Sequence, residues 1–436
     1  MKPYPRYNQS SARWYSSFPE TWSEVKAKRL FSNERERASS EDEQLAASQK
    51  YGVIPQALMM AQNNAKVMLA LKGTDNFKQV KENDFVISLR SFEGGIEHSK
   101  YNGCISPAYT VLRLRHESSN PNYFRYALKC SPFIQALNST SEGIRDGKTI
   151  TYDEFGELLV ALPNQAEQKA IATFLDRETQ RIDSLIEEKQ TFIKLLKEKR
   201  QALISHVVTK GLNPNVEMQD SGIEWIGQVP KHWEVKKIKH ICSNFMYGTS
   251  QDCNQSDVGY PVLRIPNIKS TNVDFEDLKY ANISDVDALT YLLSRGDILV
   301  IRTNGNPNLV GQSALFDSNG QYLFASYLIK LTPKRGVDTS FLVEAMNSLS
   351  VRQALTFQSR TSVGNYNLSI PSLANTSIAI PPIDEQKTIT NYLSAATINI
   401  DLLIQETDKS IDLLKEHRTS LISAAVTGKI DVREAV

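Results

Sequence analysis

The chain has few of the residues that build compact metal or disulfide sites. Its four cysteines, at positions 104, 130, 242 and 253, lie far apart and include no C-x-x-C pair. This spacing argues against a zinc cage and against a disulfide framework. The six histidines show no H-x-x-x-H spacing for a metal ion. These absences exclude the common metal-binding and disulfide-stapled classes of domain.

Long apolar runs are also missing. No stretch approaches the roughly 20 apolar residues that a membrane span needs, and the first residues, MKPYPRYNQSS, lack the apolar core of a signal peptide. The chain has 436 residues, of which 41% are hydrophobic and 23% charged. This length and composition are typical of a folded protein with two to four domains. We therefore expect a cytoplasmic protein that does not contact a membrane.

Catalytic motifs are absent as well. The segment 143–149, GIRDGKT, has three residues between its glycines where a phosphate-binding loop has four. There is no Asn-Pro-Pro-aromatic motif of an amino-methyltransferase and no glycine-rich cofactor loop after a strand. The EEK triplet at 187–189 resembles part of a nuclease site, but it lies in a charged helical stretch that solvation explains. We predict that this chain is not an enzyme.

What the chain does contain is a repeat. Residues 163–209 and 381–427 are identical at 23 of 47 positions with a fixed offset of 218. Upstream, Trp14, Pro19 and Trp22 recur as Trp225, Pro230 and Trp233 with an offset of 211. The chain is therefore two tandem copies of one unit. A duplicated unit suits a target that itself has two parts.

Each copy ends in a predicted long helix with a narrow apolar seam. Steps of three, four and seven residues between apolar positions are typical of a coiled coil. The seam consists of Ile171, Leu175, Ile182, Leu185, Ile193, Leu196, Leu203 and Val207 in the first helix, and of Ile389, Leu393, Ile400, Leu403, Ile411, Leu414 and Leu421 in the second. Such a helix of about 44 residues, or roughly 65 Å, is not stable alone, so each is expected to pair with the other.

We expect the pair to be antiparallel, because the region between the helices lets the chain return. A parallel pair would need a longer crossover, and a simple scaffold coiled coil has the same periodicity. The regions before the helices contain short strands between turns and predict mixed α and β structure. The expected strands are 85–89, 109–112 and 157–161 in the first region, and 262–265, 297–301, 327–331 and 377–380 in the second.

The predicted fold class is therefore α+β, with two mixed α/β heads joined by two long antiparallel helices in a tandem repeat with pseudo-two-fold symmetry. The expected divisions are a first head at 1–162, a first helical arm at 163–212, a second head at 213–380 and a second arm at 381–436. The arms match and the heads diverge. This contrast indicates one docking mode that presents two different reading surfaces.

Loops rich in Gly, Asn, Arg and Ser recur beside the strands of both heads. Asn and Arg make the paired hydrogen bonds that distinguish adenine and guanine, while Lys and Ser suit phosphates. Turn chemistry alone also explains Asn and Gly, but four such loops together favour a binding surface. A net charge of +1 argues weakly against a protein that coats nucleic acid by bulk charge alone. It does not exclude DNA reading by local basic patches, or with a partner that supplies phosphate contacts. The candidate DNA-binding residues are Arg90, His98, Lys100, Arg145 and Lys148 in the first head, and Arg302, Asn304, Asn306, Arg360, Asn365 and Tyr366 in the second.

Several motifs together resemble the specificity subunits of type I restriction–modification systems. They are PPIDEQK at 381–387, LISAAVTGKIDVR at 421–433, DSGIEWIGQVPKHW at 220–233, ASQKYGVIP at 47–55, SPAY at 106–109 and LRIPNI at 263–268. The likeness covers essentially the whole chain. One departure is ARWYSSFP at 12–19, which lacks the Gly and Glu of its copy at 220–233.

The resemblance implies two target-recognition domains, each reading one half of a bipartite, asymmetric site in double-stranded DNA, with the helices setting the spacing. It also implies partners, namely two methyltransferase subunits docked on the arms and motor-nuclease subunits for cleavage. S-adenosylmethionine, ATP and Mg would belong to those partners, and no cofactor to this chain. An orphan or anti-restriction subunit, or a protein-binding coiled-coil scaffold, is the alternative. A neighbouring methyltransferase gene would favour the specificity subunit.

Overall fold

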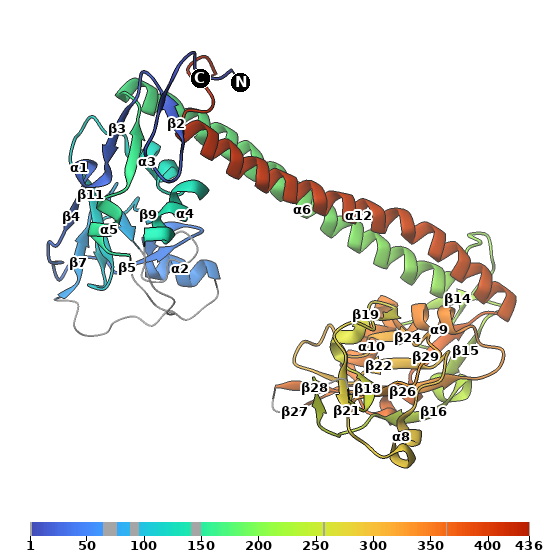
Figure 1. Cartoon of the computed structure of the whole chain (residues 1–436). Coiled ribbons are helices and arrows are strands. Elements are labelled where there is room, and N and C mark those ends of the chain that lie inside the picture. The colour runs from blue at the N-terminus through green and yellow to red at the C-terminus, as the bar shows by residue number, and fades with distance from the viewer. Residues whose placement is uncertain are drawn as a thin grey trace. The chain divides into compact units, whose positions relative to one another are not determined.

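The computed structural model describes residues 2–63, 76–87, 96–140, 150–255, 258–362 and 364–435, and the chain forms two compact units (Figure 1). Unit 1 consists of Met1–Lys189 and Lys409–Val436, and unit 2 of Gln190–Asp408. Each unit contains one head and a stretch of both long helices, α6 (Gln165–Lys210) and α12 (Ile383–Val426). No helix in the described ranges is long and apolar enough to cross a membrane.

Local sequence signals mark the ends of the two long helices. The Asn164 side chain accepts a hydrogen bond from the Glu167 backbone N–H at 3.0 Å, which caps the first turn of α6. Helix α12 has Asp384 and Glu385 in its first turn, at the positive end of the helix dipole. Gly211 and Gly428 follow the two helices with φ of +74° and +71°, the left-handed conformation that ends helices. The prediction of one long helix in each copy of the repeat is confirmed.

Within each unit the stretches of α6 and α12 run antiparallel. In unit 1 the Tyr123 hydroxyl donates to the Ala161 carbonyl, just before α6 begins, and to the Val426 carbonyl at the end of α12. In unit 2 the last turns of α6 share a core with the first turns of α12, where Ile204 and Val207 cluster with Ile389 and Leu393. The expected antiparallel pair is confirmed, and the parallel alternative is wrong.

One predicted seam residue of α12 lies outside the seam. Leu403 is 50% exposed, whereas Ile400, Thr407 and Ile411 are buried. From Ile400 the inward-facing positions advance by four, three and four residues through Ile404, so the three-residue step to Leu403 turns its side chain outward. The other predicted seam residues are buried or half-buried.

The head of unit 1 is built around a four-stranded antiparallel sheet with the order β4-β11-β8-β9, flanked by two-stranded sheets. Its strands are β1 (Tyr7–Gln9), β2 (Ser17–Pro19), β3 (Ser23–Lys26), β4 (Phe31–Glu34), β5 (Leu45–Ser48), β6 (Gly52–Pro55), β7 (Lys78–Val80), β8 (Phe85–Ile87), β9 (Ile96–His98), β10 (Gly103–Ile105), β11 (Thr110–Leu114) and β12 (Leu159–Leu162). Its helices are α1 (Ala27–Leu30), α2 (Gln56–Asn63), α3 (Pro121–Ala127), α4 (Ser131–Thr140) and α5 (Tyr152–Gly156).

The head of unit 2 has a six-stranded sheet with the order β16-β26-β22-β24-β20-β19 and smaller sheets beside it. Its strands are β13 (Met218–Asp220), β14 (Gln228–Pro230), β15 (Glu234–Lys237), β16 (Cys242–Tyr247), β17 (Cys253–Asn254), β18 (Tyr260–Leu263), β19 (Ile268–Lys269), β20 (Asn272–Val273), β21 (Lys279–Ala281), β22 (Ile298–Ile301), β23 (Thr303–Asn304), β24 (Ser313–Leu315), β25 (Leu323–Phe324), β26 (Leu328–Pro333), β27 (Arg360–Ser362), β28 (Asn365–Asn367) and β29 (Ser377–Ile380). Its helices are α7 (Ile238–Ile241), α8 (Asp285–Tyr291), α9 (Thr339–Met346), α10 (Leu349–Phe357) and α11 (Ile370–Asn375).

The two heads share a structural framework although their sequences differ strongly. Strand β3 pairs with β12 so that Lys26 lies opposite Leu159, and β15 pairs with β29 so that Lys237 lies opposite Ser377. These positions differ by the same offsets, 211 and 218, that relate the repeats. Helices α3, α4 and α5 have counterparts α9, α10 and α11 at the corresponding places of the second copy. The heads therefore diverge on a common scaffold.

Each of the seven predicted segments contains a strand, but several have different bounds, and residues 88–89 of the predicted strand 85–89 lie outside the described residues. Residues 157–158 precede β12 because Glu157 caps α5, with its backbone N–H bonded to the Asp153 carbonyl. Ile265–Asn267 forms a 3₁₀ turn that contains a proline, so β18 ends at Leu263. Tyr109 and Tyr327 each lie just before a strand, β11 and β26.

A buried glutamine joins the arm helix to the head in each unit. In unit 1 the Gln168 side chain accepts from the Asn120 N–H at 2.8 Å and donates to the Pro163 carbonyl at 2.9 Å. In unit 2 Gln386 accepts from the Asp338 N–H and donates to the Pro381 carbonyl, both at 2.8 Å. Asn120 and Asp338 each cap a head helix, α3 and α9. The head and arm of each unit are thus connected by the same contact.

Candidate nucleic-acid interface

In the second head, a small sheet brings together the two loops that the sequence singles out. Strands β23, β28 and β27 form this sheet in that order. Asn304 lies opposite Tyr366, and Arg360 lies opposite Asn367. The candidates come from two segments that are distant in sequence, yet Arg302 precedes β23, Asn306 follows it, and the remaining four lie on the three strands. The predicted surface of this head is therefore spatially continuous.

Arg302 is held firmly beside this sheet. Its Nε and one terminal nitrogen donate to Asn367 Oδ1 at 3.2 and 3.0 Å. Its guanidinium also lies 4.2 Å from the centre of the Tyr247 ring, a cation–π contact. Arg302 is half-buried, so it orders the sheet as well as presenting charge.

Asn304 and Asn306 combine turn chemistry with free donors. The Asn304 side chain accepts from the Asn306 backbone N–H at 2.8 Å, and the Asn306 side chain accepts from the Asn308 N–H at 3.0 Å. These contacts use only the carbonyl oxygens of the side chains. Within the described ranges their amide nitrogens have no hydrogen-bond partner. These two asparagines do stabilise a turn, as the alternative interpretation expects. Their amide N–H groups remain available to donate to a ligand.

In the first head, three of the five candidates, Arg90, Arg145 and Lys148, lie outside the described residues. His98 ends β9, and its Nε2 lies 3.1 Å from Asn83 Oδ1. Burial and the nearby charges of Arg125 and Lys100 lower the pKa of His98 to about 4. The imidazole is therefore neutral at neutral pH and can donate or accept, but it does not carry a charge to a phosphate. Lys100 is exposed two residues beyond it.

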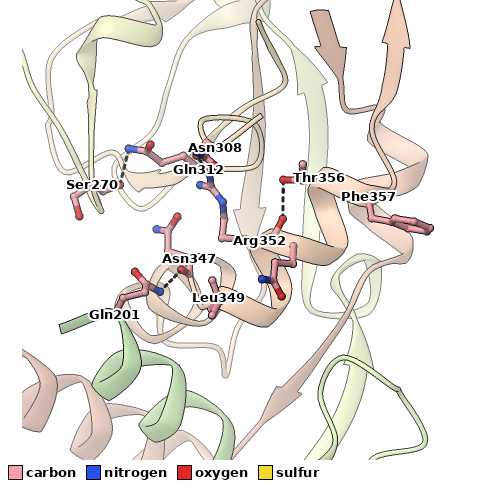
Figure 2. Close-up of a pocket in the computed structure, with 10 residues that line it drawn as sticks. Gln201, Ser270, Asn308, Gln312, Asn347, Leu349, Arg352, Thr356 and Phe357 are labelled. Atoms are coloured by element: carbon pink, nitrogen blue, oxygen red, sulfur yellow. Dashed lines mark hydrogen bonds between the residues drawn. The ribbon is translucent and has the colours of Figure 1, made fainter. Parts of the chain in front are cut away.

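Unit 2 also has an amide-rich pocket that the sequence does not reveal (Figure 2). Its volume is about 650 Å³, and it is lined by Gln201, Ser270, Asn308, Gln312, Asn347, Leu349, Arg352, Gln353, Thr356 and Phe357. Gln201 of α6 donates to the Asn347 carbonyl at 3.0 Å, so the arm forms part of the wall. No local motif marks these residues, because four separate segments contribute them.

Arg352 is the most unusual residue of this pocket. One terminal nitrogen donates to the Asn308 carbonyl, while its Nε is buried without a hydrogen-bond partner. Burial lowers the pKa of Arg352 to about 10, and no carboxylate pairs with it within the described ranges. The guanidinium nevertheless stays charged at neutral pH.

Metal and thiol chemistry have little support here. Across the residues that the structure describes, no group of three His, Cys, Asp or Glu side chains is arranged to hold a metal ion. Cys104, Cys130 and Cys242 are buried, and burial raises the pKa of Cys130 and Cys242 to about 12. Such thiols stay protonated and unreactive at neutral pH.

Comparison with models of known protein families identifies the family of this chain. The model described as "Type I restriction modification DNA specificity domain" matches the chain twice, at residues 19–195 and 230–411. Each match contains most of one head and most of the long helix that follows it. The chain belongs to this family. Its two specificity domains are the two copies seen in the sequence, and the predicted resemblance is confirmed.

Individual relatives agree with this assignment. The chain is 24% identical over 314 residues to the type I restriction enzyme EcoKI specificity subunit of Escherichia coli K12, which covers 71% of this chain and 65% of that protein. A chain from a structure described as "Structural basis underlying complex assembly and conformational transition of the type I R-M system" has a TM-score of 0.71 at 14% identity, covering 95% of this chain and 99% of that one. The HsdS subunit of Thermoanaerobacter tengcongensis has a TM-score of 0.52 at 15% identity, with the same coverage.

These similarities establish the specificity-domain fold. The candidate DNA-binding residues remain predictions. The framework pairs, β3 with β12 and β15 with β29, lie at both ends of each head. The candidate loops of the second head lie between them in sequence. This arrangement allows the loops to vary without disturbing the arm.

Proposed function

We propose that this chain reads a bipartite DNA site for a type I restriction–modification assembly, with each head reading one half. The observation that supports the proposal is that two unlike heads are joined to the arms by the same hydrogen bonds. The Gln168 and Gln386 contacts are the same in both units, whereas the heads differ in sequence and in their described main sheets, which have four strands in unit 1 and six in unit 2. Two unlike half-sites are what such a protein would recognise, which makes the whole site asymmetric.

The proposed division of labour places the chemistry in partner proteins. Two methyltransferase subunits would dock on the arms, and motor-nuclease subunits would join for cleavage. S-adenosylmethionine, ATP and Mg would be bound by those subunits, and this chain would supply sequence recognition only. Purified alone, it should show no methyl transfer, nucleotide hydrolysis or DNA cleavage. Reproducible turnover of S-adenosylmethionine by the lone chain would contradict this division.

Methylome sequencing of cells with and without this gene tests the proposal directly. A split motif that is methylated only when the gene is present is the expected result. Exchanging residues 222–380 for the second head of another member should then change one half of the motif and leave the other. A chimera that changes both halves would contradict independent heads. No gene-dependent motif at all would favour an orphan subunit or a scaffold that binds protein.

We further propose that the paired arm helices set the spacing between the two half-sites. Helices α6 and α12 contain 46 and 44 residues, and 1.5 Å per residue makes each about 65–70 Å long. Packed coiled-coil helices resist bending and compression better than a flexible linker does. The spacing would then be a property of helix length, which insertions can change.

A further inference from the structure

Unit 1 contains a pocket whose walls are mostly cationic. It has a volume of about 400 Å³ and is formed by the β5–β6 turn, the end of β9, helix α3 and helix α12. Five basic side chains line it, namely Lys50, Lys100, Arg125, Lys129 and Arg418, with Glu97 as the single carboxylate. So many like charges around one pocket repel each other unless something neutralises them.

Three of the five cations are neutralised within the protein. Lys129 Nζ lies 2.7 Å from Glu97 Oε2 and also donates to the Gln49 carbonyl. The Glu97 side chain is only 2% exposed, so this carboxylate lies behind the lysine and is shielded from the solvent. Arg125 pairs with Asp176, and Arg418 pairs with Asp183.

The other two cations, Lys50 and Lys100, have no ion pair within the described ranges. Both are exposed, whereas Arg125, Lys129 and Arg418 are half-buried. The pocket and its paired carboxylates therefore carry an excess of two positive charges. Burial is the main cause of the lowered pKa of His98, and the positive charges of Arg125 and Lys100 lower it further.

The framework shared by the two heads does not require the charges of Arg125 and Lys129. At the offset that relates the two arms, the counterparts of Arg125 and Lys129 are Val343 and Asn347 in unit 2. Helix α9 occupies the place of α3 there and keeps the same contact with the arm through Asp338 and Gln386. Arg125 and Lys129 are therefore particular to the first head, whereas Arg418 lies on the arm and corresponds to Arg200 in the other copy.

We propose that this pocket of unit 1 binds a phosphate group of the DNA backbone, with Lys50 and Lys100 as its principal contacts. This inference rests on the proposed DNA-reading function and adds a site to it. The half-buried cations are ion-paired, whereas the exposed ammonium groups of Lys50 and Lys100, which form the rim, have no carboxylate partner in the described ranges. Lys50 Nζ lies 5.0 Å from the centre of the Tyr51 ring, a cation–π contact that leaves it exposed. An exposed rim suits a phosphodiester that passes over the surface as part of a long strand. A site for a small free anion would be expected to enclose its ligand with buried donors instead.

Salt dependence of binding provides the test. The full chain, assembled with its methyltransferase partner, is titrated with a fluorescent random-sequence duplex across a salt series. The double variant Lys50→Gln/Lys100→Gln removes both rim charges at exposed positions. Neutralising one phosphate contributes about 0.9 to the magnitude of the slope of log K against log salt, so losing this one contact should reduce the magnitude of the slope by about 0.9. Target and random duplexes should weaken by the same factor.

The control is Lys2→Gln/Lys169→Gln, which removes two exposed lysines away from the pocket and causes the same change of net charge. A slope for the pocket variant equal to that of the control would overturn the proposal. A titration with inorganic phosphate is the second experiment. If phosphate binds the wild-type pocket while the DNA slope is unchanged in the variant, a free phosphate compound is the ligand, and the DNA assignment is wrong.

The proposed function fails by a different result. If the assembled wild-type protein shows no preference for any sequence, the reading function is wrong, even where the pocket variant lowers the salt slope. If sequence preference is intact and the slope does not change, only the phosphate site is wrong.

Discussion

Arg418 of α12 pairs with Asp183 of α6 in unit 1, with 2.9 Å between Arg418 Nε and Asp183 Oδ1. In unit 2, Arg200 of α6 pairs with Asp401 of α12 at 3.0 Å. Asp401 and Arg418 are the counterparts of Asp183 and Arg200 in the second copy of the repeat. Each unit therefore contains the same ion pair with the roles of the two repeats exchanged. The duplication has preserved a contact between copies in addition to the residues themselves.

This relationship predicts compensating charge reversals. Asp183→Arg places two arginines together and should destabilise unit 1, and adding Arg418→Asp should restore most of the loss. Both side chains are substantially exposed, so the coupling energy in a double-mutant cycle should be only about 0.2–1 kcal/mol. Urea unfolding of the four proteins measures it. The same cycle on Arg200 and Asp401 should give a similar value, and a coupling of zero in both units would contradict an energetic role.

The buried glutamines predict a larger effect. Gln168→Met leaves the Asn120 N–H and the Pro163 carbonyl without their partners, and a buried unpaired group costs about 1–3 kcal/mol. Gln386→Met should cost a similar amount in unit 2. Gln165→Met makes the same chemical change at an exposed position of the same helix and should be nearly neutral. Hydrogen exchange should show faster exchange of the Asn120 amide only in the Gln168 variant.

The glycines that follow the arms predict a graded series. A Cβ at Gly428 would lie 2.3 Å from Pro19 Cδ, and one at Gly211 would lie 3.3 Å from the Trp233 ring. Gly222 has a similar φ of +70° but no atom within 4 Å of the added Cβ. Gly222→Ala should therefore cost about 1–2 kcal/mol for the left-handed backbone alone. Gly211→Ala should cost more and Gly428→Ala most, as measured by denaturant unfolding. Equal losses at all three positions would show that the close contacts relax freely.

The reading surface of the second head predicts separable effects on binding and stability. Asn306→Asp keeps the oxygen that accepts from the Asn308 N–H but loses the amide donors that adenine recognition requires. It should leave thermal stability unchanged and remove about 1–3 kcal/mol of discrimination at one base. Asn308→Asp adds the same charge two residues away and is the control for general repulsion from DNA. Arg302→Ala should weaken binding and also lower stability, because it breaks the contacts with Asn367 and Tyr247.

Much of the arm was predictable because its signals are local. A seven-residue apolar period, a capping Asn164 and the closing glycines Gly211 and Gly428 lie within a few residues of the structure that they specify. The antiparallel pairing followed from the repeat. The outward orientation of the Leu403 side chain did not follow from the repeat. The apolar seam shifts gradually around the helix, and where it shifts depends on how the two helices pack.

The site was predictable only in part, for the opposite reason. The composition of the loops in the second head indicated a binding surface. The sheet that joins Asn304 to Tyr366, however, depends on pairing between distant segments of the chain. The pocket of unit 1 gathers Lys50, Lys100 and Arg418 from across the chain. Lys50 and Arg418 carry no local signature of binding, and only the folded framework brings them together.

The length of the arms predicts the length of the spacer in the DNA site. Seven residues inserted after Thr191 and seven after Lys409 would lie opposite each other, since these points are related by the offset between the repeats and by the antiparallel pairing of Asp183 with Arg418. Seven residues preserve the apolar period and turn the helix by about 700°, which is within about 20° of two full turns. They add about 10.5 Å, or about three base steps at roughly 3.4 Å. Methylome sequencing should therefore find the same half-sites about three base pairs further apart.

Four residues inserted after Thr191 alone provide the contrast. They leave α12 unchanged and shift the apolar seam of α6 out of register with it, so assembly and methylation should be lost because the helices no longer pack. If the paired insertion retains methylation at the original spacing, the helices do not set the spacing between half-sites. If it abolishes methylation although the protein still folds and binds its methyltransferase subunits, the half-sites tolerate no change in separation, and shorter paired insertions of the same design would then locate the limit.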